Sequence, residues 1–204
     1  MIFTLALCAR LQRLRRACEG IAALEFALVF PAVLMLVMGV IEVSMALFIS
    51  ALMEGGLRDA ARFGITGTPP ASGTREQAII DIVNDRLMGF ATITSSDMNM
   101  RVYKCLSQVG KPEPLTHDAN GNGKYDPGDT YTDINGNGQW DADMAMSGAG
   151  GSGDVVVYEL TLNWQLLTPF LAPFFGDDGT FPLKASIAVR NEPWVINNGQ
   201  GGTC

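Results

Sequence analysis

An apolar run from Ile21 to Met53 constrains this chain more than any other feature. As one helix, the run would be about 50 Å long at about 1.5 Å per residue. The hydrocarbon core of a bilayer is only about 30 Å thick, so the sequence predicts a helix that begins in a membrane and emerges from it. Glu25 and Glu42 lie within the run, and carboxylates at membrane depth usually mark a function or a partner.

Basic residues before the run predict its direction. Arg10, Arg13, Arg15 and Arg16 directly precede it, and basic flanks stay on the cytoplasmic side. Residues after Met53 are therefore expected outside. A cleaved secretory signal fits poorly, because its apolar region has only roughly 7–15 residues. A plain single-span anchor fits the length but gives the two glutamates no role.

The composition of the chain argues against nucleic-acid binding, zinc binding and enzymatic catalysis. The formal net charge is −7, which argues against nucleic acid as the main partner because binding to phosphates needs a basic surface. One His and four Cys exclude a zinc finger or a His-rich metal centre. His117 is expected to be an exposed loop residue, and no Ser or Cys lies in a recognisable nucleophile motif, so we do not expect an enzyme.

The junction between the basic and apolar segments carries a motif. Residues 15–26 read RRACEGIAALEF, in which Gly20 is followed by an apolar stretch with Glu25 at its fifth position. This pattern resembles a type IV prepilin processing site, and the longer stretch resembles the TadE-like minor pilins of the Tad pilus system. An Ala- and Arg-containing segment at 58–67 and an acidic-Pro ending at 188–193 are also similar to that family.

The resemblance implies a processing and assembly pathway. A prepilin peptidase would cut after Gly20 and release the amine of Ile21, which the Glu25 carboxylate of a neighbouring subunit can neutralise in apolar surroundings. Phe26, where major pilins often have Tyr, favours a minor pilin. The implied partners are sister pilins and the Tad inner-membrane assembly platform, with the C-terminal domain periplasmic and later on the pilus.

Two alternatives stay open from the residues alone. The chain could instead be an uncleaved, membrane-anchored calcium-binding scaffold protein. Glu42 lies near the outer membrane boundary, where it is either a solvated carboxylate or a second contact between subunits.

Hydrophobic periodicity predicts an α+β fold beyond the membrane. Alternating apolar residues indicate strands in the second half, and an antiparallel sheet packed on the C-terminal half of the long pilin-like helix would cover both apolar faces. The expected elements are a helix over 21–66, a second helix over 74–89 capped by Thr74, and strands over 100–105, 156–164 and 181–190. The expected organisation is a leader over 1–20, the helix over 21–66, and a domain over 67–204 with an acidic insert at 117–144.

The insert contains a duplicated pattern typical of calcium loops, D-x-[DN]-x-[DN]-G. Oxygen ligands at this spacing wrap one hard cation. The first copy offers Asp118, Asn120, Asn122, the Lys124 carbonyl, Asp126 and Asp129. The second copy offers Asp133, Asn135, Asn137, the Gln139 carbonyl and Asp141. Its twelfth position is Met144, so the second site must either borrow an oxygen, with Asp143 as the candidate, or bind its ion weakly.

Calcium is expected to act as a structural staple for the insert. The segment is strongly acidic and would repel itself without a cation, since it shows no core of its own. The alternative is an acidic Asn-Gly turn repeat that binds no metal.

The cysteines divide between the two sides of the membrane. Cys8 and Cys18 lie in the leader, whereas Cys105 and Cys204 lie outside, where disulfides persist. A Cys105–Cys204 disulfide is predicted, and a free, buried Cys105 with a loose Cys204 is the alternative.

Overall fold

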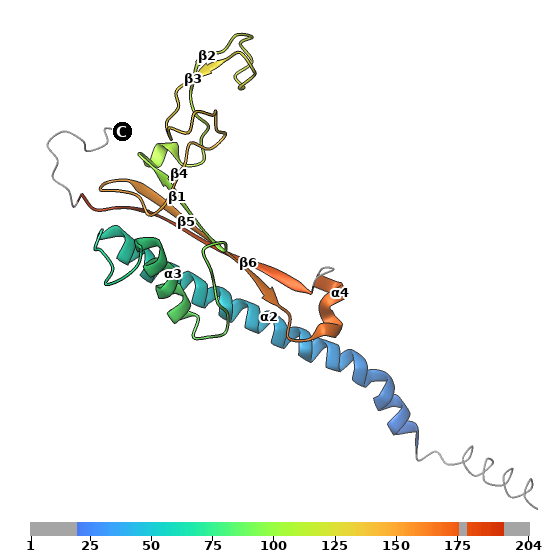
Figure 1. Cartoon of the computed structure of the whole chain (residues 1–204). Helices are drawn as coiled ribbons and strands as arrows, with labels where there is room; N and C mark the ends of the chain where they lie inside the picture. Colours follow the sequence, from blue (N-terminus) through green and yellow to red (C-terminus); the bar gives the residue numbers. More distant parts are fainter. Residues whose placement is uncertain (1–19, 176–178, 194–204) are drawn as a thin grey trace, which may run out of the picture. The chain divides into compact units, whose positions relative to one another are not determined.

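The computed structural model describes residues 20–175 and 179–193. They form the expected α+β fold, in which a long apolar helix packs on a small antiparallel sheet (Figure 1). The elements in chain order are α2 (Ile21–Ile65), α3 (Arg75–Arg86), β1 (Met98–Tyr103), the 3-10 turn η2 (Leu106–Gln108), β2 (Leu115–His117), β3 (Thr130–Tyr131), β4 (Met146–Ser147), β5 (Val155–Gln165), the 3-10 turn η3 (Pro169–Leu171), α4 (Ala172–Phe175) and β6 (Thr180–Arg190).

The chain divides into two compact units. One comprises Met1–Met45 and Leu166–Gly179, and the other comprises Ala46–Gln165 and Thr180–Cys204. Helix α2 contributes to both units. It runs without interruption through Pro31, and by length and composition it can cross a membrane.

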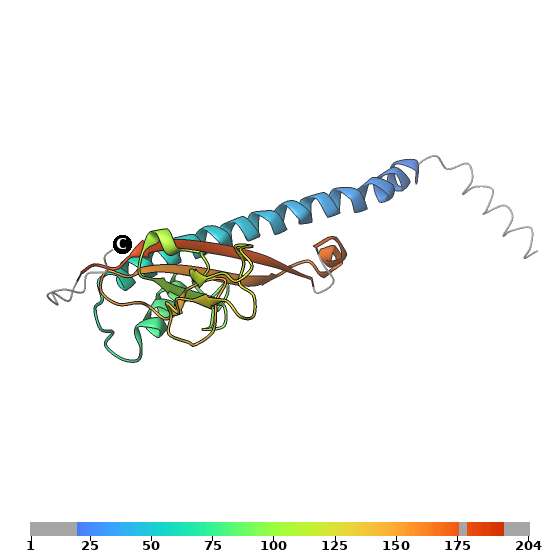
Figure 2. The same ribbon diagram turned by 90° about the horizontal axis from the view of Figure 1, so that it is seen from above.

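The larger unit is built on a four-stranded antiparallel sheet in the order β4-β1-β5-β6. The two longest strands pair along their whole length, from Val155 opposite Arg190 to Gln165 opposite Thr180. The second half of α2 lies along this sheet (Figure 2). It buries a stripe of apolar side chains at helical spacing, made of Ile49, Met53, Leu57, Ala60 and Ala61.

Helix α3 packs against α2 through small residues. Its N-terminus is capped as expected, because the Thr74 hydroxyl accepts a hydrogen bond from the Gln77 N–H at 3.2 Å. Gly56 of α2 is so close to α3 that a Cβ there would lie 3.2 Å from the Val83 Cα. The absence of a side chain at this position therefore lets the two helix backbones approach each other.

Strand β5 is covered on both faces at its start, whereas its alternating pattern predicts one covered face. Val156 and Tyr158 are buried on one face, as expected, but Val155 and Val157 are buried as well. The second pair packs in a cluster with Tyr103 and Met144, against which Val109, Ile134 and Ala145 also pack. Met144 thus anchors the base of the insert to the sheet.

The end of β6 closes onto the end of α2. The Glu192 N–H donates to the Ile65 carbonyl at 3.0 Å, so a residue after the last strand binds a carbonyl of the final helical turn. The Asn191 amide donates to the carbonyls of Ala149 and Gly151 at 3.1 and 2.9 Å. These bonds give the segment at 188–193 a structural role in joining helix, sheet and the loop before β5.

Candidate functional site

The start of α2 places the candidate processing and assembly residues on an open surface. Gly20 directly precedes the helix, and Ile21 is its first residue. Glu25 and Phe26 are both exposed, and the Phe26 ring packs against that of Phe30, with 5.2 Å between ring centroids. Both side chains are therefore accessible to a neighbouring molecule.

Glu42 is buried, unlike the solvated boundary carboxylate that the sequence allowed. It is only 2% exposed, and its Oε1 accepts hydrogen bonds from the Thr168 N–H at 2.6 Å and from the Thr168 hydroxyl at 2.7 Å. Its Oε2 is buried and has no hydrogen-bond partner among the described residues. Thr168 lies in the connection between β5 and β6, so this connection covers the glutamate.

The first acidic loop folds around the Asp118 carboxylate. Its two oxygens accept from the Gly121 and Gly123 N–H groups, each at 2.7 Å. Gly123 has a φ of +72°, a conformation that glycine adopts without steric cost. These backbone donors, that of Gly123 foremost, lower the pKa of Asp118. Asp118 is therefore held as a carboxylate.

The remaining candidate ligands of the first loop converge. The Asn120 and Asn122 side-chain amides both donate to the Asp126 Oδ2, at 2.9 and 2.7 Å. The Asn122 Oδ1 accepts from the Lys124 N–H at 2.7 Å. At the twelfth position, Asp129 accepts from the N–H groups of the second and ninth residues, Ala119 at 2.9 Å and Asp126 at 2.8 Å.

The second loop repeats this arrangement. Asp133 accepts from Gly136 and Gly138 N–H groups at 2.6 and 2.8 Å. The Asn135 and Asn137 amides both donate to the Asp141 Oδ2 at 2.6 Å. The Gln139 N–H donates to the Asn137 Oδ1 at 2.7 Å.

Glu113 takes the place of the acidic side chain that the second loop lacks at its twelfth position. Its Oε1 accepts from the Ile134 N–H at 2.7 Å, and its Oε2 accepts from the Asp141 N–H at 3.2 Å. These donors are the second and ninth residues of the loop, the same two positions that Asp129 binds in the first. Glu113 is 1% exposed. It lies outside the repeat pattern because it precedes the second loop in sequence, so the pattern does not predict its contacts.

Asp143, the residue predicted to complete the second loop, lies elsewhere. Its Oδ2 accepts from the Arg101 guanidinium at 2.6 Å and from the Tyr103 hydroxyl at 2.9 Å. Arg101 also forms an ion pair with Glu159 on β5. Asp143 therefore ties the base of the insert to the sheet, while Glu113 holds the second loop.

An aromatic stack joins the two loops, although the sequence shows no core for the insert. The Tyr125 ring stacks on Trp140, with centroids 4.9 Å apart and an interplanar angle of 9°. Tyr125 also meets the Tyr131 ring edge to face at 5.6 Å. The Trp140 indole N–H donates to the Glu113 carbonyl at 3.0 Å. The insert thus has a small core between its loops.

These loops offer the oxygen chemistry that calcium prefers. Among the described residues, no three His, Cys, Asp or Glu side chains form a ready metal cluster. A calcium site in these loops would draw on asparagine and backbone oxygens as well as carboxylates. In the structure the side-chain nitrogens of Asn120 and Asn122 face Asp126, and those of Asn135 and Asn137 face Asp141, so these amides would have to turn over to offer their oxygens to a cation there.

Cys105 and a nearby hollow complete the candidate features. Cys105 is disulfide-bonded, and its predicted partner Cys204 lies outside the described residues, so that pairing stays a prediction. Cys8 and Cys18 also lie outside them.

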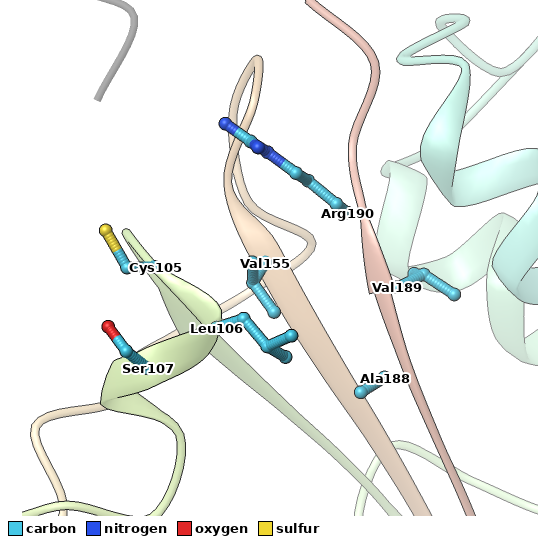
Figure 3. Close-up of a pocket in the computed structure, with 7 residues that line it drawn as sticks. All are labelled: Cys105, Leu106, Ser107, Val155, Ala188, Val189 and Arg190. Carbon is cyan, nitrogen blue, oxygen red and sulfur yellow. The ribbon is translucent and has the colours of Figure 1, made fainter. Parts of the chain in front are cut away.

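A hollow of about 340 Å³ lies beside Cys105 (Figure 3), and its lining residues are Cys105, Leu106, Ser107, Val155, Ala188, Val189 and Arg190. This mostly apolar lining brings no acid and base together. His117 is an exposed residue of β2.

Comparison with known proteins points to one family. Residues 20–62 match the model of a family described as TadE-like protein. The match begins at Gly20 and covers most of α2. The matched family is related to the Tad pilus and is not an enzyme family, and α2, which contains most of the match, is long and apolar enough to cross a membrane. No curated protein and no solved structure is significantly similar to the chain.

Proposed function

We propose that this TadE-like chain is a minor pilin of a Tad-type pilus. In this proposal a prepilin peptidase cuts after Gly20, and the processed subunit leaves the inner membrane for the filament, where it contributes to pilus biogenesis and surface adhesion. Its partners are sister pilins and the inner-membrane assembly platform. The leader lies on the cytoplasmic side and the larger unit in the periplasm before assembly.

The single observation that carries the proposal is the bare apolar surface of α2. Along the first half of the helix, large apolar side chains remain exposed on all sides. They include Leu24, Phe26, Leu28, Val29, Leu36, Val40 and Val43. A surface of this kind requires lipid before assembly and neighbouring helices afterwards. The family match to residues 20–62 supports the same role.

Glu25 gives this surface its specificity. An ionised carboxylate in apolar surroundings is costly unless it is paired. Cleavage after Gly20 creates such a pair, because the amine of Ile21 in one subunit can meet Glu25 of another. The exposed position of Glu25, about one turn from Ile21, leaves it accessible for that contact.

The mature N-terminus tests the proposal directly. Mass analysis of the protein from its native cells should show a chain that begins at Ile21. A Gly20→Val variant should stay uncut while its fold is unchanged, because a Cβ at Gly20 meets no atom within 4 Å. A Gly39→Val variant, at another open helical glycine, is the control and should be cut normally. A wild-type chain that keeps Met1 and never copurifies with pili would instead support an uncleaved anchor.

We further propose that the insert at 117–144 binds calcium as a structural ion. The first loop would use Asp118, Asn120, Asn122, Asp126 and Asp129 with the Lys124 carbonyl. The second would use Asp133, Asn135, Asn137 and Asp141 with the Gln139 carbonyl, and Glu113 in place of Asp143. The observation that favours this function is the matching role of Asp129 and Glu113 toward the second and ninth residues of their loops.

Calcium titration of the full chain in detergent tests this second function. We expect two ions, with affinities near those of extracellular calcium modules, about 10⁻⁴–10⁻³ M. Glu113→Gln should weaken only the second ion, and Asp118→Asn should weaken only the first. Glu54→Gln, at an exposed helical position, is the control. Equal calcium affinity of wild type and Glu113→Gln would show that Glu113 is not a calcium ligand. No binding at millimolar calcium would refute the calcium-binding function.

A further inference from the structure

The connection between β5 and β6 has the composition of a membrane-facing segment. From Leu166 to Phe175 it reads LLTPFLAPFF and contains no charged residue. Two large apolar side chains point to solvent, Leu167 with 54% of its surface exposed and Phe170 with 48%. Solvent-exposed apolar side chains that lie together usually mark a surface covered by another molecule or by lipid.

Glu42 fixes the depth of this connection on α2. Both the N–H and the hydroxyl of Thr168 donate to the Glu42 Oε1, so the connection lies beside the helix at that residue. From Ile21 to Glu42 the helix rises about 32 Å at about 1.5 Å per residue, close to the thickness of about 30 Å of a hydrocarbon core. If α2 spans the membrane from Ile21, Thr168 lies at its outer boundary.

The residues next to Glu42 on α2 have apolar side chains that could face lipid. Ile41 and Val43 on either side of it are exposed and apolar, whereas Glu42 is buried beneath the connection. A carboxylate at this depth would be costly if it faced lipid tails. The two Thr168 donors satisfy the Oε1, and the Oε2 is buried without a hydrogen-bond partner among the described residues.

We propose that residues 166–173 form a second membrane contact, which inserts Leu167 and Phe170 into the outer lipid interface beside α2. The occupant of this surface before assembly is the headgroup and upper acyl region of the bilayer. This contact rests on the proposed membrane span of α2, but not on cleavage or pilus assembly.

Photolabelling of the wild-type chain in phospholipid vesicles tests the contact. One lipid carries a diazirine near its glycerol and another carries it at the end of an acyl chain, and the labelled residues are mapped by mass spectrometry. Residues 166–173 should be labelled by the first lipid and spared by the second. The stretch at 28–36 should be labelled by the chain-end probe.

The possible results distinguish failure of the lipid contact at 166–173 from failure of the membrane span of α2. Labelling of 28–36 without 166–173 would overturn the inference while the membrane span stands, and crosslinks from 166–173 to a second copy in place of lipid would do the same. No labelling of 28–36 would show that the premise itself is wrong. A Leu167→Ser/Phe170→Ser variant should lose the label at 166–173 and keep that at 28–36. Leu106→Ser, which removes an exposed apolar side chain elsewhere, should change neither.

Discussion

Tyr158 shows how a single buried group sets the response of the fold to alkaline pH. Its ring is fully buried on β5, its hydroxyl has no hydrogen-bond partner among the described residues, and burial raises its pKa to about 12. An unfolded tyrosine titrates at about 10, so the folded state holds this proton more tightly. The resulting stability is complete below about pH 10 and is lost as the pH rises toward about 12.

The Tyr158→Phe variant should therefore lose less stability than wild type at alkaline pH. The part of the decline that depends on Tyr158 amounts to about 2–3 kcal/mol between about pH 10 and 12. Urea unfolding of both chains at pH 8 and at pH 11.5, all in the same detergent, measures it. At pH 8 the Tyr158→Phe chain should be at least as stable as wild type, because a buried hydroxyl without a hydrogen-bond partner carries an uncompensated desolvation cost. Parallel pH dependence of the two chains would contradict the assignment.

Gly64 is sterically coupled to the same hydroxyl. A Cβ at Gly64 would clash with the Tyr158 hydroxyl oxygen and lie 3.3 Å from its Cζ. We expect Gly64→Ala to destabilise the larger unit by about 1–3 kcal/mol through overpacking. In a Tyr158→Phe background the cost should be smaller, since the clashing atom is gone.

A double-mutant cycle measures this coupling by chemical unfolding. Gly39→Ala serves as the control, because its Cβ would meet no atom within 4 Å. Additive effects of the Gly64 and Tyr158 substitutions would show that the clash is relieved elsewhere.

At the scale of elements, the insert has a fixed base and two loops that depend on charge compensation. The base is held by Met144 in the cluster under β5 and by Asp143 on Arg101. In the loops, backbone N–H groups donate to the Asp118 and Asp133 carboxylates, and the Tyr125 and Trp140 rings stack between the loops. If these loops hold calcium as proposed, its removal should loosen the loops and leave the sheet intact.

Limited proteolysis with and without a chelator checks this expectation. Chelation should speed cleavage within 118–129 and 133–141, while cuts within β1 and β5 stay rare. An Asp118→Asn/Asp133→Asn chain should be cut quickly in both conditions. The same cutting rate with and without chelator in wild type would count against a structural ion.

At the scale of the whole molecule, assembly should depend on one carboxylate that the isolated subunit leaves exposed. Glu25→Ala should preserve membrane insertion and processing but impair incorporation into pili, because the amine of a neighbouring Ile21 then has no acid to pair with. Immunoblots of sheared pili and of membranes measure the two pools.

Glu54→Ala is the matched control for that experiment. Glu54 lies on the same helix, but it is exposed and pairs with Arg58 one turn along, at 3.2 Å, so its loss should leave assembly unchanged. Normal incorporation of the Glu25→Ala chain would refute the pairing role.

Elements with a strong local pattern could be predicted from the sequence. The apolar run predicts α2, the Thr74 cap predicts α3, and alternation predicts β5 and β6, because each of these depends on neighbours a few residues away. The contacts of Glu113 and of Glu42 could not be predicted. Each glutamate binds backbone groups brought close only by the tertiary fold, as Thr168 is to Glu42.

One signal for Glu113 was nevertheless present. The second loop lacks an acid at its twelfth position, so a carboxylate from outside the loop was a candidate to fill that position. Asp143 lies within that loop, at its eleventh position, but its carboxylate binds Arg101 and Tyr103 instead. The short strands β2, β3 and β4 and the turns after Thr168 were also missed, because two or three residues are too few to show a period.

The position of Glu113 also determines how long a segment must be to transfer both acidic loops to another protein with their contacts. A graft of 118–143 alone would carry both repeats but leave the second without its buried acid and without the carbonyl that holds Trp140. The Met144 N–H also binds the Lys111 carbonyl at 3.0 Å, which brings the two ends of the longer segment together. The shortest segment that keeps both loops, Glu113 and this backbone bond between its ends is therefore 111–144.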